Sequence, residues 1–106
     1  MARFYEPLEG GAVRCLSCER RCIVSDGRRG ACGNYRNRGG VLEHLGYGRL
    51  SALESRPIEL KPLFHYWPNS TATTYSTWGC NFYCPWCQNH HLSFTHPEGS
   101  EPWLDP

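Results

Sequence analysis

The chain has 106 residues, of which Leu, Ile, Val and Phe together supply only 19, the same number as Gly and Pro. A chain of this length leaves roughly 35–40% of its unfolded surface exposed after folding, so it forms at most one small domain with a thin core. The net charge of +1 and the 14 aromatic residues exclude a chain kept disordered by charge. The composition excludes a large enzyme within these 106 residues and predicts that metal ligation supports the fold.

Seven cysteines form two groups with 47 residues between them: Cys15, Cys18, Cys22 and Cys32, then Cys80, Cys84 and Cys87. Residues 1–11 lack the apolar run of a secretory signal, and no segment is apolar enough to span a membrane, which predicts a cytoplasmic protein. Thiols stay reduced there, so close spacing favours metal ligands over disulfides. Four thiolates complete a tetrahedral site, whereas three leave one coordination position open.

Residues 1–40 are predicted to form a metal-binding knuckle made of turns, because residues 12–40 are rich in Gly, Arg and Cys and show no helical or strand period. Residues 41–68 are predicted to form a β-hairpin over 41–53, turning at Gly46–Gly48, followed by an extended Pro-rich connector. The apolar side chains of this connector are expected to lie along a core: Leu60, Leu63, Phe64, Tyr66 and Trp67.

Residues 69–106 are predicted to begin a further unit. The β-branched run from Thr71 to Thr77 predicts a strand that delivers the second cysteine group on a loop. The residues after Cys87 predict a short helix, which Pro and Gly residues from His96 onward end. The expected fold class is therefore mostly irregular with small β content.

The second cysteine group has the spacing C-x3-C-x2-C, so one loop can turn three sulfurs toward a common centre. In ferredoxin-type clusters every iron has a thiolate, and three ligands therefore imply a distant fourth ligand or an iron with an open position. A zinc site completed by His90 or His91 is the alternative, because His and Cys commonly share zinc.

The spacing of Cys80, Cys84 and Cys87, with the aromatic Trp86 just before the third cysteine, resembles the signature of the radical S-adenosylmethionine (SAM) superfamily. The resemblance implies that these cysteines bind three irons of a 4Fe–4S cluster and that SAM chelates the fourth. It also implies that Trp86 lies near the SAM adenine, and that one electron from the cluster cleaves SAM to methionine and a 5′-deoxyadenosyl radical. An electron donor such as flavodoxin or ferredoxin is then an expected partner.

The flanking residues narrow the resemblance. The stretches at 57–66, 79–82 and 87–89, together with the first cysteine group, are similar to the radical SAM member of the AmmeMemoRadiSam system, a family described as like the pyruvate formate-lyase activating enzyme. A glycyl-radical activase role, in which a hydrogen atom is removed from a Gly of a partner protein, is an expectation from that analogy alone. The resemblance covers residues 12–94 and implies the first strand and cluster loop of a partial (β/α) barrel. A whole partial barrel needs on the order of 200 residues, so this chain is expected to be too short for activity alone.

The first cysteine group has the spacing C-x2-C-x3-C-x9-C and lies among several glycines. A closed four-cysteine site in a Gly-rich knuckle favours structural zinc at Cys15, Cys18, Cys22 and Cys32. An auxiliary 4Fe–4S cluster is the rival, because the same four thiolates suit it.

The segment from Arg14 to Arg38 holds seven Arg against two acidic residues. This basic field supports an alternative function, a zinc-knuckle module without catalytic activity that binds protein or nucleic acid, with Tyr35 stacking on a base. Such a module has no need for three further cysteines with an open position, so nucleic acid is not the expected partner.

Overall fold

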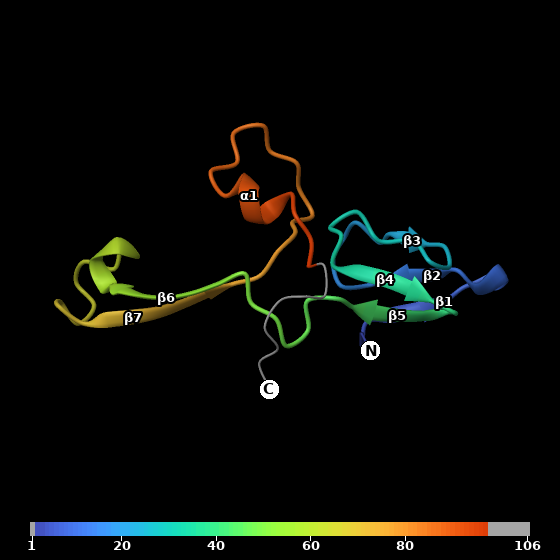
Figure 1. The fold of residues 1–106 in the computed structure, drawn as a ribbon, viewed down its shortest axis with the longest axis horizontal. Coiled ribbons are helices and arrows are strands. Elements are labelled where there is room, and N and C mark those ends of the chain that lie inside the picture. The colour runs from blue at the N-terminus through green and yellow to red at the C-terminus, as the bar shows by residue number, and fades with distance from the viewer. Residues whose placement is uncertain (1, 98–106) are drawn as a thin grey trace.

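A computed structural model describes residues 2–97 of the chain. Strands β1 to β5 gather at one end, a long two-stranded ribbon of β6 and β7 forms the other, and the second cysteine loop rises between them (Figure 1). The small, mostly irregular fold with antiparallel β-structure and almost no helix agrees with the expected class. The last part of the predicted third unit, residues 98–106, lies outside the described residues.

The first sheet holds β1 (Tyr5–Pro7), β2 (Val13–Cys15) and β3 (Ile23–Val24), all antiparallel in that order. A short 3₁₀ turn, η1 (Glu9–Gly11), joins β1 to β2. Val13 and Cys15 on the central strand are both buried, while Arg14 between them is half-exposed. The prediction that residues 12–40 form turns only was therefore wrong, because strands of two to four residues are too short to produce a readable period.

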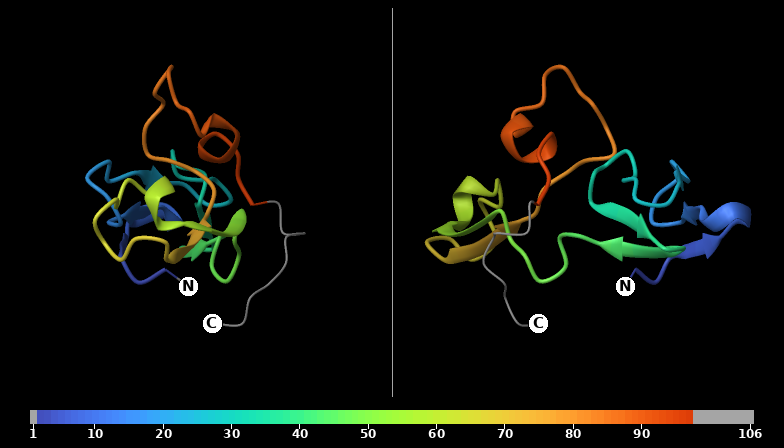
Figure 2. Two further views of the ribbon diagram at one scale, coloured as in Figure 1. Left: turned by 90° about the vertical axis from the view of Figure 1, so that its left-hand side faces the viewer. Right: turned by 45° about the vertical axis from the view of Figure 1, so that its right-hand side comes forward.

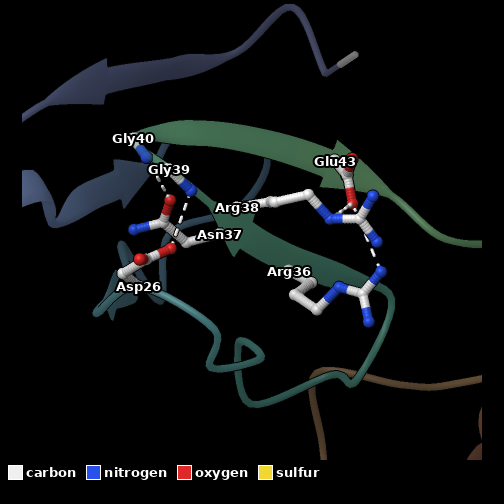
Figure 3. Close-up of polar contacts among 7 residues, drawn as sticks. All are labelled: Asp26, Arg36, Asn37, Arg38, Gly39, Gly40 and Glu43. Atoms are coloured by element: carbon white, nitrogen blue, oxygen red, sulfur yellow. Dashed lines mark hydrogen bonds and ion pairs between the residues drawn. The ribbon is translucent and has the colours of Figure 1, made fainter.

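The second sheet is a hairpin of β4 (Tyr35–Arg38) and β5 (Val41–His44), with Arg38 paired to Val41. Its two-residue turn, Gly39–Gly40, has φ of +59° and +81°, which non-Gly residues rarely adopt. The Gly39 amide donates to Asp26 Oδ1 at 2.7 Å and the Gly40 amide to Asn37 Oδ1 at 2.9 Å (Figure 3). The predicted hairpin over 41–53 was wrong in its pairing, because Val41–His44 turns back at Gly39–Gly40 rather than at Gly46–Gly48.

The core lies between these two sheets. Val13, Val24 and Leu42 are almost fully buried, Cys15 belongs to the same cluster, and Tyr35 packs against it. Asn37 is also fully buried, and its side-chain amide donates to the carbonyls of Gly11 and Val24, both at 2.8 Å. Asn37 thus joins β4 to the first sheet.

The third sheet pairs β6 (Ala52–Pro57) with β7 (Thr71–Ser76) in a register that runs from Ala52↔Ser76 to Pro57↔Thr71. The predicted strand over Thr71–Thr77 is confirmed, and so is a short helix after Cys87, α1 (His90–Ser93). No helix among residues 2–97 is long and apolar enough to cross a membrane.

The segment between β6 and β7 contains a 3₁₀ turn, η2 (Ile58–Leu60), and buries Ile58. Its other large apolar side chains are 49–75% exposed: Leu60, Leu63, Phe64, Tyr66 and Trp67. The prediction that they lie along a core is therefore wrong for the described residues. A two-stranded ribbon is a single layer, and it buries apolar side chains only where a second layer covers it.

Candidate metal centres

The four thiols of the first cysteine group line one cavity of about 210 Å³. They come from the end of β2, from the turn between β2 and β3, and from the turn before β4, so three separate backbone segments meet there. The wall holds Cys15, Cys18, Cys22 and Cys32 together with Ser17, Arg20, Gly30, Tyr35 and Asn81. The structure thus brings all four predicted ligands of this group to one place.

Backbone hydrogen bonds explain how the first group folds. The amide of Cys15 donates to the carbonyl of Cys22 at 2.9 Å, which closes the β2–β3 connection and brings its two ends together. The amide of Arg21 donates to the carbonyl of Cys18 at 3.2 Å, and Arg21 has a positive φ of +47°. Cys18 and Cys22 flank this tight turn, and both line the cavity that Cys32 also lines.

The thiols of the first group also influence one another electrostatically. Burial raises the pKa of the Cys32 thiol above its ordinary value, against an opposing hydrogen bond from the Asn34 backbone amide. The thiols of Cys15, Cys22 and Cys18 raise this pKa further. A bound cation removes this repulsion and stabilises all four thiolates, so the donor set suits a divalent metal that displaces protons on binding.

Within residues 2–97, no group of three or more His, Cys, Asp or Glu side chains is already arranged to hold a metal ion. The four thiols of the first group therefore surround their cavity without meeting at coordination distance. Zinc–sulfur bonds are about 2.3 Å long, so ligation requires these side chains to turn inward. Donor type and number at this site fit zinc and fit an iron–sulfur cluster equally.

The second cysteine group lies on the loop between β7 and α1, and Cys80, Cys84 and Cys87 are all half-buried. The Phe82 amide donates to the Cys80 sulfur at 3.4 Å. The amide of Cys87 donates to the Cys84 carbonyl at 3.1 Å, and the Cys87 thiol lies 3.5 Å from Ser93 Oγ. The three predicted ligands share one loop, but the structure does not gather their sulfurs into a finished site.

The other predicted residues of this loop are open to solvent. Trp86 is 83% exposed. His90 and His91, the alternative zinc ligands, are exposed on α1, and His90 Nδ1 lies 3.3 Å from the Cys87 carbonyl oxygen. A groove of about 500 Å³ separates the β6–β7 ribbon from α1, and His91 is the only one of these predicted residues in its wall.

Contacts between the two cysteine groups were not predicted from the sequence. The Asn34 side chain donates to the Trp78 carbonyl at 2.6 Å, and Arg20 Nη1 donates to the Asn81 carbonyl at 2.8 Å. The chain after β7 passes beside the turn that precedes β4 (Figure 2). Gly79, at φ +79°, is the one local signal for this close approach, because a glycine directly before a cysteine suggests a tight backbone contact.

The chain is similar to an archaeal protein over most of its length. The "Uncharacterized protein MJ0808" of Methanocaldococcus jannaschii is 45% identical over 97 residues, which are 92% of this chain and 29% of the relative. The chain therefore spans less than a third of that protein's length. No family model and no solved structure matches the chain.

Proposed function

We propose that the chain is the N-terminal part of a radical SAM enzyme, in which Cys80, Cys84 and Cys87 bind a 4Fe–4S cluster. The observation that carries the proposal is the local order of elements: strand β7, a loop with three cysteines at C-x3-C-x2-C spacing, and then helix α1. A strand–loop–helix unit of this kind is what the resemblance predicts for the start of a partial (β/α) barrel.

The donor set on this loop fits such a cluster. Three thiolates are too few for a closed ferredoxin-type cluster, and they leave one iron for SAM. A cluster held by these three thiolates would supply the one electron needed for reductive cleavage of the sulfonium S–C5′ bond of SAM to methionine and a 5′-deoxyadenosyl radical. A donor such as flavodoxin or ferredoxin would supply that electron to the cluster. The exposed ring of Trp86 offers an apolar face to the adenine of SAM.

The first cysteine group is proposed to bind zinc through Cys15, Cys18, Cys22 and Cys32. Support comes from the shared cavity and from the position of Cys15 in the small core, where ligation adds stability that few apolar side chains provide. The auxiliary 4Fe–4S cluster remains the competing occupant of these four thiolates. A protein substrate, as for an activating enzyme of glycyl radicals, is proposed by analogy only.

The zinc-knuckle alternative has less support, because much of the basic field is engaged within the chain. Five of the seven arginines between residues 14 and 38 have partners: Arg14 pairs with Glu6, Arg21 with Glu19, both Arg36 and Arg38 with Glu43, and Arg20 with the Asn81 carbonyl (Figure 3 for Glu43). Binding of an oligonucleotide that weakens steeply with salt would favour this alternative.

Metal and sulfide analysis after anaerobic reconstitution tests the proposal. The wild-type chain should gain about four iron and four sulfide ions at the second group, and replacement of Cys80, Cys84 and Cys87 by Ala should remove them. A matched double variant, His90→Ala with His91→Ala, should keep the iron, because the cluster does not use these side chains. Iron unchanged in the triple variant, or zinc that depends on either His, contradicts the proposal.

The same samples identify the occupant of the first group. About one zinc per chain should persist in the triple variant and should be lost when the four cysteines of the first group are replaced. Iron in place of this zinc assigns the first group to an auxiliary cluster.

A further inference from the structure

The two cysteine groups are in direct contact through residues that lie beside their cysteines. Arg20 lies between Cys18 and Cys22, and its guanidinium donates to the carbonyl of Asn81, the residue after Cys80. Asn81 also forms part of the wall of the first group's cavity. One residue of the second loop is therefore held at the edge of the first site.

Asn34 makes a second connection and uses two different groups to do so. Its backbone amide donates to the Cys32 sulfur, while its side chain donates to the carbonyl of Trp78 at 2.6 Å. Gly79 lies against the Cys32 carbonyl so closely that a Cβ would overlap it. The Cys32 carbonyl and the Asn34 side chain thus contact the chain that leads into Cys80.

Tyr83, further along the second cysteine loop, also contacts the segment that carries Cys32. The Tyr83 hydroxyl donates to the carbonyl of Ala31 at 2.8 Å, immediately before Cys32. Tyr83 also stacks on Phe94, which follows α1, with ring centroids 5.7 Å apart. The loop from Trp78 to Tyr83 is therefore bound along the segment that carries Cys18, Cys22 and Cys32.

From this arrangement we infer that metal ligation at Cys15, Cys18, Cys22 and Cys32 orders the second cysteine loop, with Arg20 and Asn34 as the positioning residues. Ligation fixes the backbone of residues 18–34, and that backbone supplies the partners of the loop. A loop that is already ordered loses less conformational entropy when a cluster binds. Because coupling between two sites is reciprocal, cluster binding to the loop would strengthen metal binding at the first group by the same factor. The inference rests on the metal proposed for the first group, but it does not require iron at the second.

Backbone hydrogen exchange of the reduced, anaerobic chain tests the inference with zinc ion alone as the probe. Zinc should slow exchange at the Gly79–Phe82 amides about tenfold in the wild type, a coupling within the usual range of about 5- to 150-fold. The variants Arg20→Ala and Asn34→Ala should lose most of this zinc-dependent protection. Arg20→Lys, which keeps a charged donor, should restore part of it.

Arg21→Ala is the matched control, because Arg21 is the neighbouring arginine and pairs with Glu19 within its own segment. Its zinc-dependent protection should equal that of the wild type. A parallel titration with cobalt(II), followed by the thiolate charge-transfer absorption, shows whether the first group is filled in every variant.

Three results overturn the inference. These are zinc binding without protection of the Gly79–Phe82 amides, equal loss of protection in Arg20→Ala and Arg21→Ala, and absence of zinc or cobalt binding at the first group. The first two leave the proposed metal site standing, and the third removes it as well. Iron and sulfide content after reconstitution tests the radical SAM proposal separately. A failure of that proposal can therefore be distinguished from a failure of this inference.

Discussion

Replacement of Gly79 by Ala should detach the second cysteine loop from the first group. Gly79 has φ +79°, and a Cβ there would overlap the Cys32 carbonyl and lie 2.7 Å from Asn34 Nδ2, whereas ordinary contact begins at 3.4 Å. The backbone must therefore move by about 0.7 Å or more. That shift stretches the 2.6 Å bond from Asn34 to Trp78 beyond about 3.2 Å and disturbs the 3.0 Å bond from the Gly79 amide to Leu92.

The expected cost combines two contributions. An Ala held at positive φ costs about 1–2 kcal/mol, and two lost hydrogen bonds cost about 1 kcal/mol each, so Gly79→Ala should lower the free energy of unfolding by about 3–4 kcal/mol. Gly11→Ala is the matched control, because Gly11 has φ +78° and nothing lies within 4 Å of its Cβ position. This control should cost only about 1–2 kcal/mol.

Urea unfolding of the reduced, zinc-supplemented protein, followed by tryptophan fluorescence, measures both variants, because Trp78 lies at the junction. Equal losses in Gly79→Ala and Gly11→Ala would refute the close packing of the loop on Cys32. A larger loss in Gly11→Ala would refute the steric argument as a whole.

Two further predictions concern the first two sheets. Asn37→Ala removes a buried side chain that forms hydrogen bonds to two carbonyls and one amide. It should lower the free energy of unfolding by about 3 kcal/mol, as measured by urea unfolding followed by circular dichroism. A decrease of less than about 1 kcal/mol would contradict the role of Asn37 in joining the sheets. His44, whose ring centroid lies 4.8 Å from that of Tyr35, has a pKa lowered by burial, so the unfolded chain binds its proton more tightly. The wild type should therefore lose stability as the pH falls below about 6.5. His44→Phe should lose less stability than the wild type between pH 7.5 and 5.5, as measured by thermal unfolding. The same pH dependence in both proteins would contradict the lowered pKa of His44.

Local signals in the sequence explain which parts of the fold could be predicted. The β-branched run at Thr71–Thr77 predicted β7, and the residues after Cys87 predicted the short helix α1. The pairing of β5 was not predicted, although Gly39–Gly40 between two short strands is a two-residue turn signal. Strands β4 and β5 have four residues each, too few to show a clear alternation of apolar and polar residues beside this turn.

The ligands of the first cysteine group could be predicted from the sequence, but the contacts between the two cysteine groups could not. Cys15, Cys18, Cys22 and Cys32 lie within 18 residues, so their spacing alone predicted a common site, and all four line one cavity. The contact between Arg20 and Asn81 spans 61 residues, and nothing distinguishes Arg20 from the other arginines around it in the sequence. Long-range contacts of this kind depend on the folded backbone and leave no periodic or spacing signal.

We propose that Cys80, Cys84 and Cys87 hold a cluster with one iron open to SAM. Electron paramagnetic resonance of the reconstituted, reduced chain, recorded with and without SAM, tests it most directly. We expect a 4Fe–4S signal that changes when SAM is added and that is absent from the Cys80→Ala, Cys84→Ala, Cys87→Ala triple variant. A signal that ignores SAM, or one that persists in the triple variant, would contradict it.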